Sequence, residues 1–144
     1  MTTRDPEEAS SESAVEIPQK TTSARILVVD DEQVILDFLD RVLTEEGYNT
    51  ETEVDPEKTL LKLQNAKYDI VFIDIKMPHI NGIELYTQLK EIAPYLVGRV
   101  IFITGDTMGT DTRQFLDESK AHYITKPVDI DQLKKVISRI LSEN

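Results

Sequence analysis

The sequence contains no cysteine, no apolar run long enough to cross a membrane, and far fewer basic than acidic residues. The lack of cysteine excludes disulfides, cysteine metal ligands and cysteine nucleophiles, and it fits a reducing compartment. No apolar stretch marks a signal peptide or a membrane span, so we expect a cytoplasmic protein without membrane contact. With 27 acidic residues, 16 basic residues and a net charge of −11, we expect no direct binding to nucleic acid.

The residues that are present divide the chain into two parts. The first 24 residues carry five acidic and two basic residues, clustered serines and threonines, and almost nothing to bury. Such a segment cannot offset its own ordering entropy, so we expect residues 1–24 to form a flexible acidic tail or linker. The rest of the 144-residue chain is long enough to bury a core, and we place one domain at residues 25–144.

Short apolar runs alternate with helical patterns along this domain. The runs are too short for helices and are typical of strands buried on both faces. Between them, apolar residues three and four apart indicate amphipathic helices. Five strand-helix pairs predict an α/β fold, a doubly wound, five-stranded parallel sheet of order 2-1-3-4-5 with flavodoxin-like (βα)5 topology. The expected strands are Ile26–Val29, Tyr48–Val54, Asp69–Ile73, Val100–Ile103 and Ala121–Thr125.

Polar residues collect where these strands end. Asp30 and Asp31 follow the first strand, Asp74 the third, Thr104 the fourth and Lys126 the fifth. Ligands bind outside the carboxyl ends of such strands, where the strand order reverses. Three converging carboxylates are unfavourable unless a cation neutralises them. Oxygen ligands without histidine or cysteine favour Mg²⁺, or Mn²⁺, over zinc.

The remaining strand-end residues suit phosphoryl oxygens. Lys126 supplies a positive charge and Thr104 a hydroxyl donor. Asp74 is the natural nucleophile, because a carboxylate can form an acyl phosphate without a general base. The residues therefore predict a site that accepts a phosphoryl group.

Four strings now point to a family: ILVVDDE at 26–32, DIVFIDIKMPHINGIEL at 69–85, VIFITGD at 100–106 and HYITKP at 122–127. In this order and spacing, they resemble the CheY-like receiver (response regulator) domains of two-component signal transduction. The resemblance implies a phosphorelay switch and not an enzyme with a substrate of its own. A histidine kinase or a histidine phosphotransfer protein would pass a phosphoryl group to Asp74, which would become a 4-aspartylphosphate.

The resemblance also implies a role for each site residue. Asp31 and Asp74 would bind Mg²⁺ directly, together with the backbone carbonyl of Lys76, and Asp30 would act mainly through a bound water. Thr104 and Lys126 would hold the phosphoryl oxygens.

Other matched positions concern the response to phosphorylation. Tyr123 matches the aromatic switch position, and the bond between Lys126 and Pro127 matches one that is usually cis in the family. The helix around Phe115, the strand Ala121–Thr125 and the final helix would form the face that binds a downstream partner or a second copy of the chain.

Three residues depart from the common pattern or vary within the family. Lys76 and Asp106 occupy positions that tune hydrolysis, and our hypothesis is that this oppositely charged pair narrows access for the attacking water. An exposed pair is worth only about 0–1 kcal/mol, so the effect would be mainly steric. Lys120 stands where receivers usually place a left-handed glycine, so either it costs about 1 kcal/mol or the helix ends differently.

Several alternatives remain. The chain ends soon after its final helix, which favours a single-domain response regulator without a DNA-binding output. It could instead be the receiver segment of a hybrid histidine kinase, because AVEIPQ at 14–19 resembles the last strand of a kinase ATPase domain. A phosphatase of the haloacid dehalogenase type needs a second acid where Lys76 stands. A nucleotide or flavin site would place a phosphate beside Asp30 and Asp31, which repel it. A metal-free scaffold does not need the five site residues.

Overall fold

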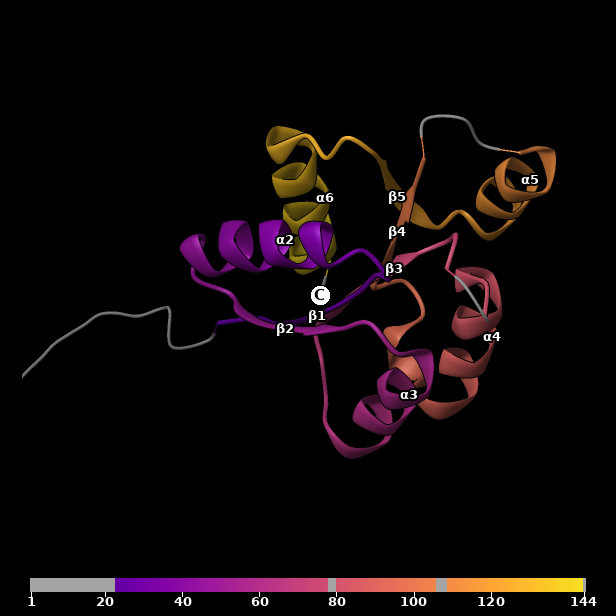
Figure 1. Cartoon of the computed structure of the whole chain (residues 1–144), viewed down its shortest axis with the longest axis horizontal. Helices are drawn as coiled ribbons and strands as arrows, with labels where there is room; N and C mark the ends of the chain where they lie inside the picture. The colour runs from indigo at the N-terminus through magenta and orange to yellow at the C-terminus, as the bar shows by residue number, and fades with distance from the viewer. Residues whose placement is uncertain (1–22, 78–79, 106–108, 144) are drawn as a thin grey trace, which may run out of the picture.

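Figure 1 presents the computed structural model of the chain, which describes residues 23–77, 80–105 and 109–143. Residues 1–22 of the predicted tail and the tuning residue Asp106 therefore lie outside the described residues. Within the described ranges, no helix combines the length and the apolar character needed to span a membrane.

Strands and helices alternate along the described residues. In chain order they are β1 (Arg25–Val29), α2 (Gln33–Glu45), β2 (Asn49–Glu53), α3 (Pro56–Asn65), β3 (Ile70–Asp74), α4 (Gly82–Ile92), the 3-10 turn η2 (Pro94–Leu96), β4 (Val100–Thr104), α5 (Thr110–Ser119), β5 (His122–Thr125) and α6 (Ile130–Ser142). The strands form one sheet of order β2-β1-β3-β4-β5, in which every neighbouring pair is parallel. The predicted fold class and strand order are confirmed.

Helices cover the sheet on both faces, α2 and α6 on one side and α3, α4 and α5 on the other (Figure 1). Successive side chains of a strand point to opposite faces, so each central strand supplies both layers. The α2/α6 layer contains Ile26, Val28, Leu36, Leu39, Leu43, Ile70, Phe72, Ile101, Ile103, Leu133, Ile137 and Ile140. The α3/α4/α5 layer contains Leu27, Val29, Leu63, Val71, Ile73, Leu85, Tyr86, Leu89, Phe102 and Leu116.

Two strands reach one residue further than their apolar runs indicated. Asp74 is the last residue of β3 and Thr104 the last residue of β4. Their main chains continue the sheet, since Asp74 is opposite Ile103 and Thr104 is opposite Thr125. Both side chains are therefore fixed to rigid strand backbone and not to a loop.

Spacings of three and four would place Val34, Leu61 and Ile130 on the inward sides of their helices, and this prediction is wrong. Val34 is 78% exposed, Leu61 56% and Ile130 40%, whereas Leu36, which lies outside that spacing in α2, is buried. Val34 and Ile130 lie in the first turns of α2 and α6, and Leu61 lies on the solvent side of α3 between the inward-facing residues. Apolar residues three and four positions apart define one side of a helix. They do not show where the sheet beneath the helix ends, and a first turn beyond that end is exposed.

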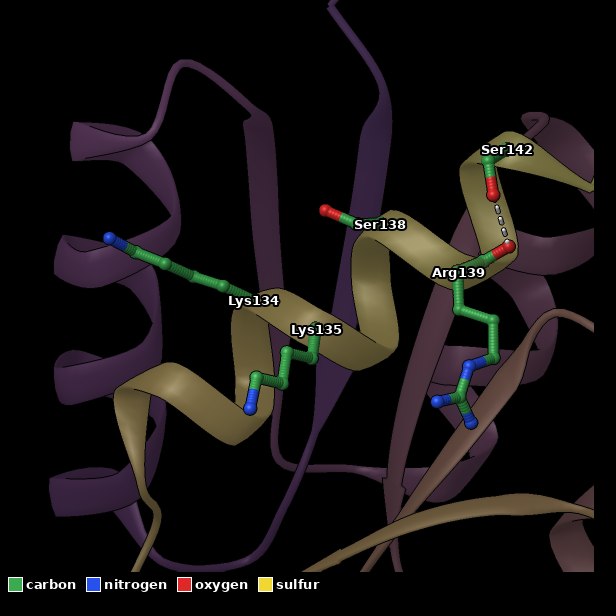
Figure 2. A pocket seen from close by; sticks show the side chains of 5 residues that line it. All are labelled: Lys134, Lys135, Ser138, Arg139 and Ser142. Atoms are coloured by element: carbon green, nitrogen blue, oxygen red, sulfur yellow. Dashed lines mark hydrogen bonds between the residues drawn. The ribbon is translucent and has the colours of Figure 1, made fainter.

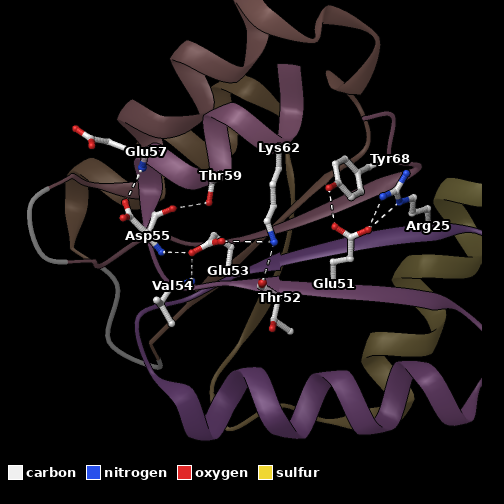
Figure 3. A network of polar contacts seen from close by, with 10 residues as sticks. All are labelled: Arg25, Glu51, Thr52, Glu53, Val54, Asp55, Glu57, Thr59, Lys62 and Tyr68. Carbon is white, nitrogen blue, oxygen red and sulfur yellow. Dashed lines mark hydrogen bonds and ion pairs between the residues drawn. The ribbon is translucent and has the colours of Figure 1, made fainter. Parts of the chain in front are cut away.

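The edge strand β2 is polar, and its acidic residues are paired (Figure 3). Glu51 accepts hydrogen bonds from the guanidinium of Arg25 at 3.0 Å and from the hydroxyl of Tyr68 at 2.8 Å. Burial and the bond to Glu51 raise the pKa of Tyr68 to about 12. Glu53 lies 3.4 Å from the ammonium of Lys62. Charged side chains of this kind protect an open sheet edge from pairing with other strands.

Two backbone positions have special requirements. Lys120 ends α5 in the left-handed conformation, with φ 55° and ψ 32°. The helix therefore ends as it would with the usual glycine, and does not end differently to accommodate the lysine.

At the start of α4, Gly82 packs directly on β3. A Cβ atom at Gly82 would lie 2.3 Å from the carbonyl oxygen of Asp74 and 2.8 Å from the Cα of Ile75. Only glycine allows this approach of helix and strand.

Candidate functional site

Three carboxylates meet at the carboxyl edge of the sheet, between β1 and β3. Asp30 follows β1 directly, Asp31 comes next, and Asp74 ends β3. One oxygen atom from each lies within 4.8 Å of the others. Asp30 is fully buried, Asp74 is 3% exposed, and Asp31 is exposed. The cluster thus has a buried floor and an open side toward solvent.

Lys126, just after β5, reaches the same cluster. Its Nζ atom lies 3.6 Å from Oδ2 of Asp30 and 3.7 Å from Oδ2 of Asp74. It lies closest, at 2.5 Å, to Oε1 of Glu32. Burial lowers the pKa of Lys126, but the bond to Glu32 and the charges of the two aspartates outweigh this, so that its pKa is raised. Lys126 is therefore a cation surrounded by carboxylates.

Glu32 has no role in the site that the sequence predicts. The signal was present in the string ILVVDDE, in which a third acidic residue follows the two aspartates. Glu32 is the residue before α2, and its side chain forms no capping hydrogen bond. The side chain instead points to Lys126, which no sequence pattern indicates.

The protonation of the buried pair is unusual. Burial, and after it the nearby charge of Asp30, raise the pKa of Asp74 to about 8 against the opposing charge of Lys126. Burial also raises the pKa of Asp30, against the hydrogen bond from the backbone of Glu32. Two buried carboxylates with one lysine need more positive charge if both are to be ionised.

These residues fit a hard divalent cation. Among the described residues, Asp30 Oδ2 is buried and has no hydrogen-bond partner, which leaves a lone pair directed into the cluster. All of the candidate side-chain donors are carboxylate oxygens, the ligands that Mg²⁺ prefers. Lys76, whose carbonyl was expected as a further ligand, is anchored to the cluster because its N–H lies 3.3 Å from Asp74 Oδ1.

Thr104 is tied to the site through the main chain. Its carbonyl accepts a hydrogen bond from the N–H of Lys126 at 2.8 Å, and its buried hydroxyl lies 3.4 Å from the carbonyl of Gly105. Strand alternation places its side chain on the face of Phe102, toward α4 and α5, whereas Asp74 shares the face of Phe72, toward α2 and α6. Thr104 and the carboxylates thus flank the sheet edge from opposite sides.

The remaining predicted residues contribute no side chain to the acidic cluster. Tyr123 is 39% exposed on the edge strand β5, with its ring at the surface. The bond between Lys126 and Pro127 is cis. Lys76 is exposed, and its pairing with Asp106 stays a prediction because Asp106 lies outside the described residues.

A polar hollow lies on the outer side of α6 (Figure 2), away from the acidic cluster. Its lining comes from one helix and is basic, and Lys134 extends away from Lys135 and Arg139. Lys134 pairs with Glu46, the residue after α2, at 3.2 Å. Among the described residues, no buried carboxylate lines this hollow.

Comparisons with known proteins identify the family of this chain. The sequence profile of the response regulator receiver domain matches residues 26–138. Response regulator ArlR of Staphylococcus aureus is 36% identical over 117 residues, which cover 81% of this chain and 52% of that protein. The chain thus spans about half the length of the curated relatives it matches.

Solved structures of receiver domains are similar to this chain. A CheY-like response regulator receiver domain protein of Methanospirillum hungatei superposes with a TM-score of 0.73 and 29% identity, covering 85% of this chain and 100% of that one. Chemotaxis protein CheY4 of Vibrio cholerae has a TM-score of 0.74 and 25% identity, covering 83% and 99%. With its profile match, its fold and its acidic sheet edge, the chain belongs to the response regulator receiver domain family of two-component signalling.

Proposed function

We propose that this chain accepts a phosphoryl group on Asp74 from a phosphohistidine of a histidine kinase or a histidine phosphotransfer protein. The observation that carries the proposal is a nearly buried carboxylate that ends a central strand, beside two more carboxylates and a lysine. Receiver domains act in this way in general. The proposal concerns this chain and these residues.

In the reaction, an Oδ atom of Asp74 attacks phosphorus while the bond from phosphorus to the donor nitrogen breaks. The imidazole leaves with the electron pair and takes a proton from solvent, and Asp74 becomes an acyl phosphate. Asp30, Asp31, Asp74 and the carbonyl of Lys76 would hold Mg²⁺. When bound, this ion supplies the positive charge that keeps the carboxylates ionised and offsets the charge of the incoming group.

Two further residues would hold the transferred group. Lys126, 3.7 Å from Asp74, can pair with one phosphoryl oxygen, and the hydroxyl of Thr104 can donate to another. Because Thr104 lies on the opposite side of the sheet edge from the carboxylates near Lys126, the phosphoryl group would be held between the two side chains.

The response to phosphorylation would appear on the face formed by α5, β5 and α6. The packing of α5 depends on few residues, mainly Leu116, which is buried, and Phe115, whose ring lies 5.3 Å from that of Phe102. An element with little buried surface is easily moved. Reorientation of the exposed Tyr123 would change this face, and a cytoplasmic protein partner or a second copy of the chain would then recognise it.

The test is incubation with acetyl phosphate and Mg²⁺, followed by mass measurement of the intact protein. The natural protein should gain one phosphoryl group, and it should gain none in excess chelator. Asp74→Asn should gain none, whereas Asp37→Asn, which alters an exposed residue of α2, should behave like the natural protein. Equal gain by the natural protein and Asp74→Asn, or no gain by either, contradicts the proposal.

A further inference from the structure

We infer that Glu32 is a positioning residue that holds Lys126 away from Asp74 until a phosphoryl group arrives. This inference rests on the proposed function, because it concerns how the lysine becomes available to the reaction. On phosphorylation, Lys126 would exchange one partner for another: it would release the Glu32 carboxylate and bind a phosphoryl oxygen.

The distances around Lys126 carry the inference. Its Nζ atom is 2.5 Å from Glu32 Oε1 and forms a hydrogen bond there. The distances to Asp30 and Asp74, 3.6 and 3.7 Å, are beyond the range of a hydrogen bond. Lys126 therefore forms its hydrogen bond with Glu32 and not with Asp74, the proposed nucleophile.

The main chain of Glu32 is held by hydrogen bonds on both sides, so its side chain starts from a fixed position beside the cluster. Its N–H donates to Asp30 Oδ1 at 2.9 Å. Its carbonyl accepts from the N–H groups of Ile35 and Leu36, at 3.0 and 3.2 Å, in the first turn of α2. The side chain of Glu32 is 56% exposed, whereas that of Lys126 is 23% exposed. Glu32 thus reaches the lysine from the solvent side of the cluster.

A competition between two anions follows from this arrangement. A phosphoryl group on Asp74 brings additional negative charge and several strong acceptor oxygens into a less exposed place than Glu32 occupies. Lys126 would bind the stronger acceptor and release Glu32. The bond to Glu32 then stabilises only the unphosphorylated state, so it slows phosphorylation but does not act on hydrolysis, in which Lys126 is engaged throughout.

The first experiment compares initial rates of phosphorylation by acetyl phosphate at saturating Mg²⁺. Glu32→Gln should react about two to five times faster than the natural protein, the range expected when a partly exposed ion pair is removed. The control Glu46→Gln makes the same chemical change at the other end of α2, about 20 Å away along the helix axis, beside Lys134. It should leave the rate unchanged.

Two further variants separate contact from charge. Glu32→Asp keeps the negative charge but is one methylene shorter, so it should lose the contact and react like Glu32→Gln. A general charge effect on the anionic donor would instead make Glu32→Asp behave like the natural protein. In a Lys126→Ala background, Glu32→Gln should have no effect, because the two residues act as a pair.

The hydrolysis rate of the phosphorylated protein provides an independent readout. It should be the same for the natural protein, Glu32→Gln and Glu32→Asp, whereas a structural disturbance of the site would change both rates. An unchanged or slower phosphorylation rate in both Glu32 variants overturns the inference. If the natural protein and Asp74→Asn gain phosphate equally, the proposed function itself fails, and the two failures are therefore distinguishable.

Discussion

The buried carboxylate of Asp74 should destabilise the metal-free protein at neutral pH, and Asp74→Asn should remove this cost. An exposed aspartate has a pKa of about 3.9, and that of Asp74 is raised to about 8. At about 1.4 kcal/mol for each unit, this difference sets a ceiling of roughly 5–6 kcal/mol. Because water reaches the cluster on the side of the exposed Asp31, we expect a gain for Asp74→Asn of about 2 kcal/mol at pH 8.

The sign of the pH dependence follows from protonation. Below about pH 4, Asp74 is protonated in both the folded and the unfolded chain, so it costs nothing. As the pH rises toward 8, the unfolded chain releases its proton while the folded chain retains it, and stability falls. The advantage of Asp74→Asn should therefore be small near pH 5, grow up to pH 8 and stay constant above it.

The measurement is urea unfolding of both proteins in chelator at pH 5 and pH 8. Asp117→Asn, a change at an exposed residue of α5, serves as the control and should stay within about 0.5 kcal/mol. Added Mg²⁺ should stabilise the natural protein more than Asp74→Asn, since binding to the folded state alone raises stability. If Asp74→Asn is no more stable at pH 8, or equally more stable at both pH values, the pKa of Asp74 is not raised in the folded protein.

Three further changes test other parts of the fold. Lys120→Gly should raise the free energy of unfolding by about 1 kcal/mol in urea, because it relieves a left-handed lysine, whereas Lys120→Ala should not. Gly82→Ala should lower it by more than 2 kcal/mol and abolish phosphorylation, because the new Cβ would collide with the main chain of Asp74; unchanged thermal unfolding would refute this. Burial raises the pKa of Glu51, but its hydrogen bonds lower it further, to below its usual value. Glu51→Gln should therefore cost up to about 1 kcal/mol at pH 7, a difference that disappears in acid as the natural carboxylate is protonated.

The sequence was sufficient to predict the sheet and the acidic cluster, because both follow from local patterns. Buried strands such as VIFIT read as continuous apolar runs, and strand ends in a parallel sheet meet at one edge. The positions of Asp30, Asp74 and Lys126 therefore followed from the strand order alone.

Other features depend on three-dimensional relations that spacing does not encode. The pairing of Glu32 with Lys126 joins residues far apart in sequence, and either alone resembles a solvated charge. The exposure of Val34 depends on where the sheet ends beneath α2. The reason for glycine at position 82 is the approach of α4 to β3, which no spacing in the sequence shows.

The opposite orientations of Asp74 and Thr104 have a mechanical consequence. The two helical layers of this domain are separated by the sheet, and side chains of one layer do not reach the other through it. A phosphoryl group on Asp74 that also contacted Thr104 would cross-link the layers at the rim of the sheet. Its hydrolysis would remove that link and let α5 relax independently of α2 and α6.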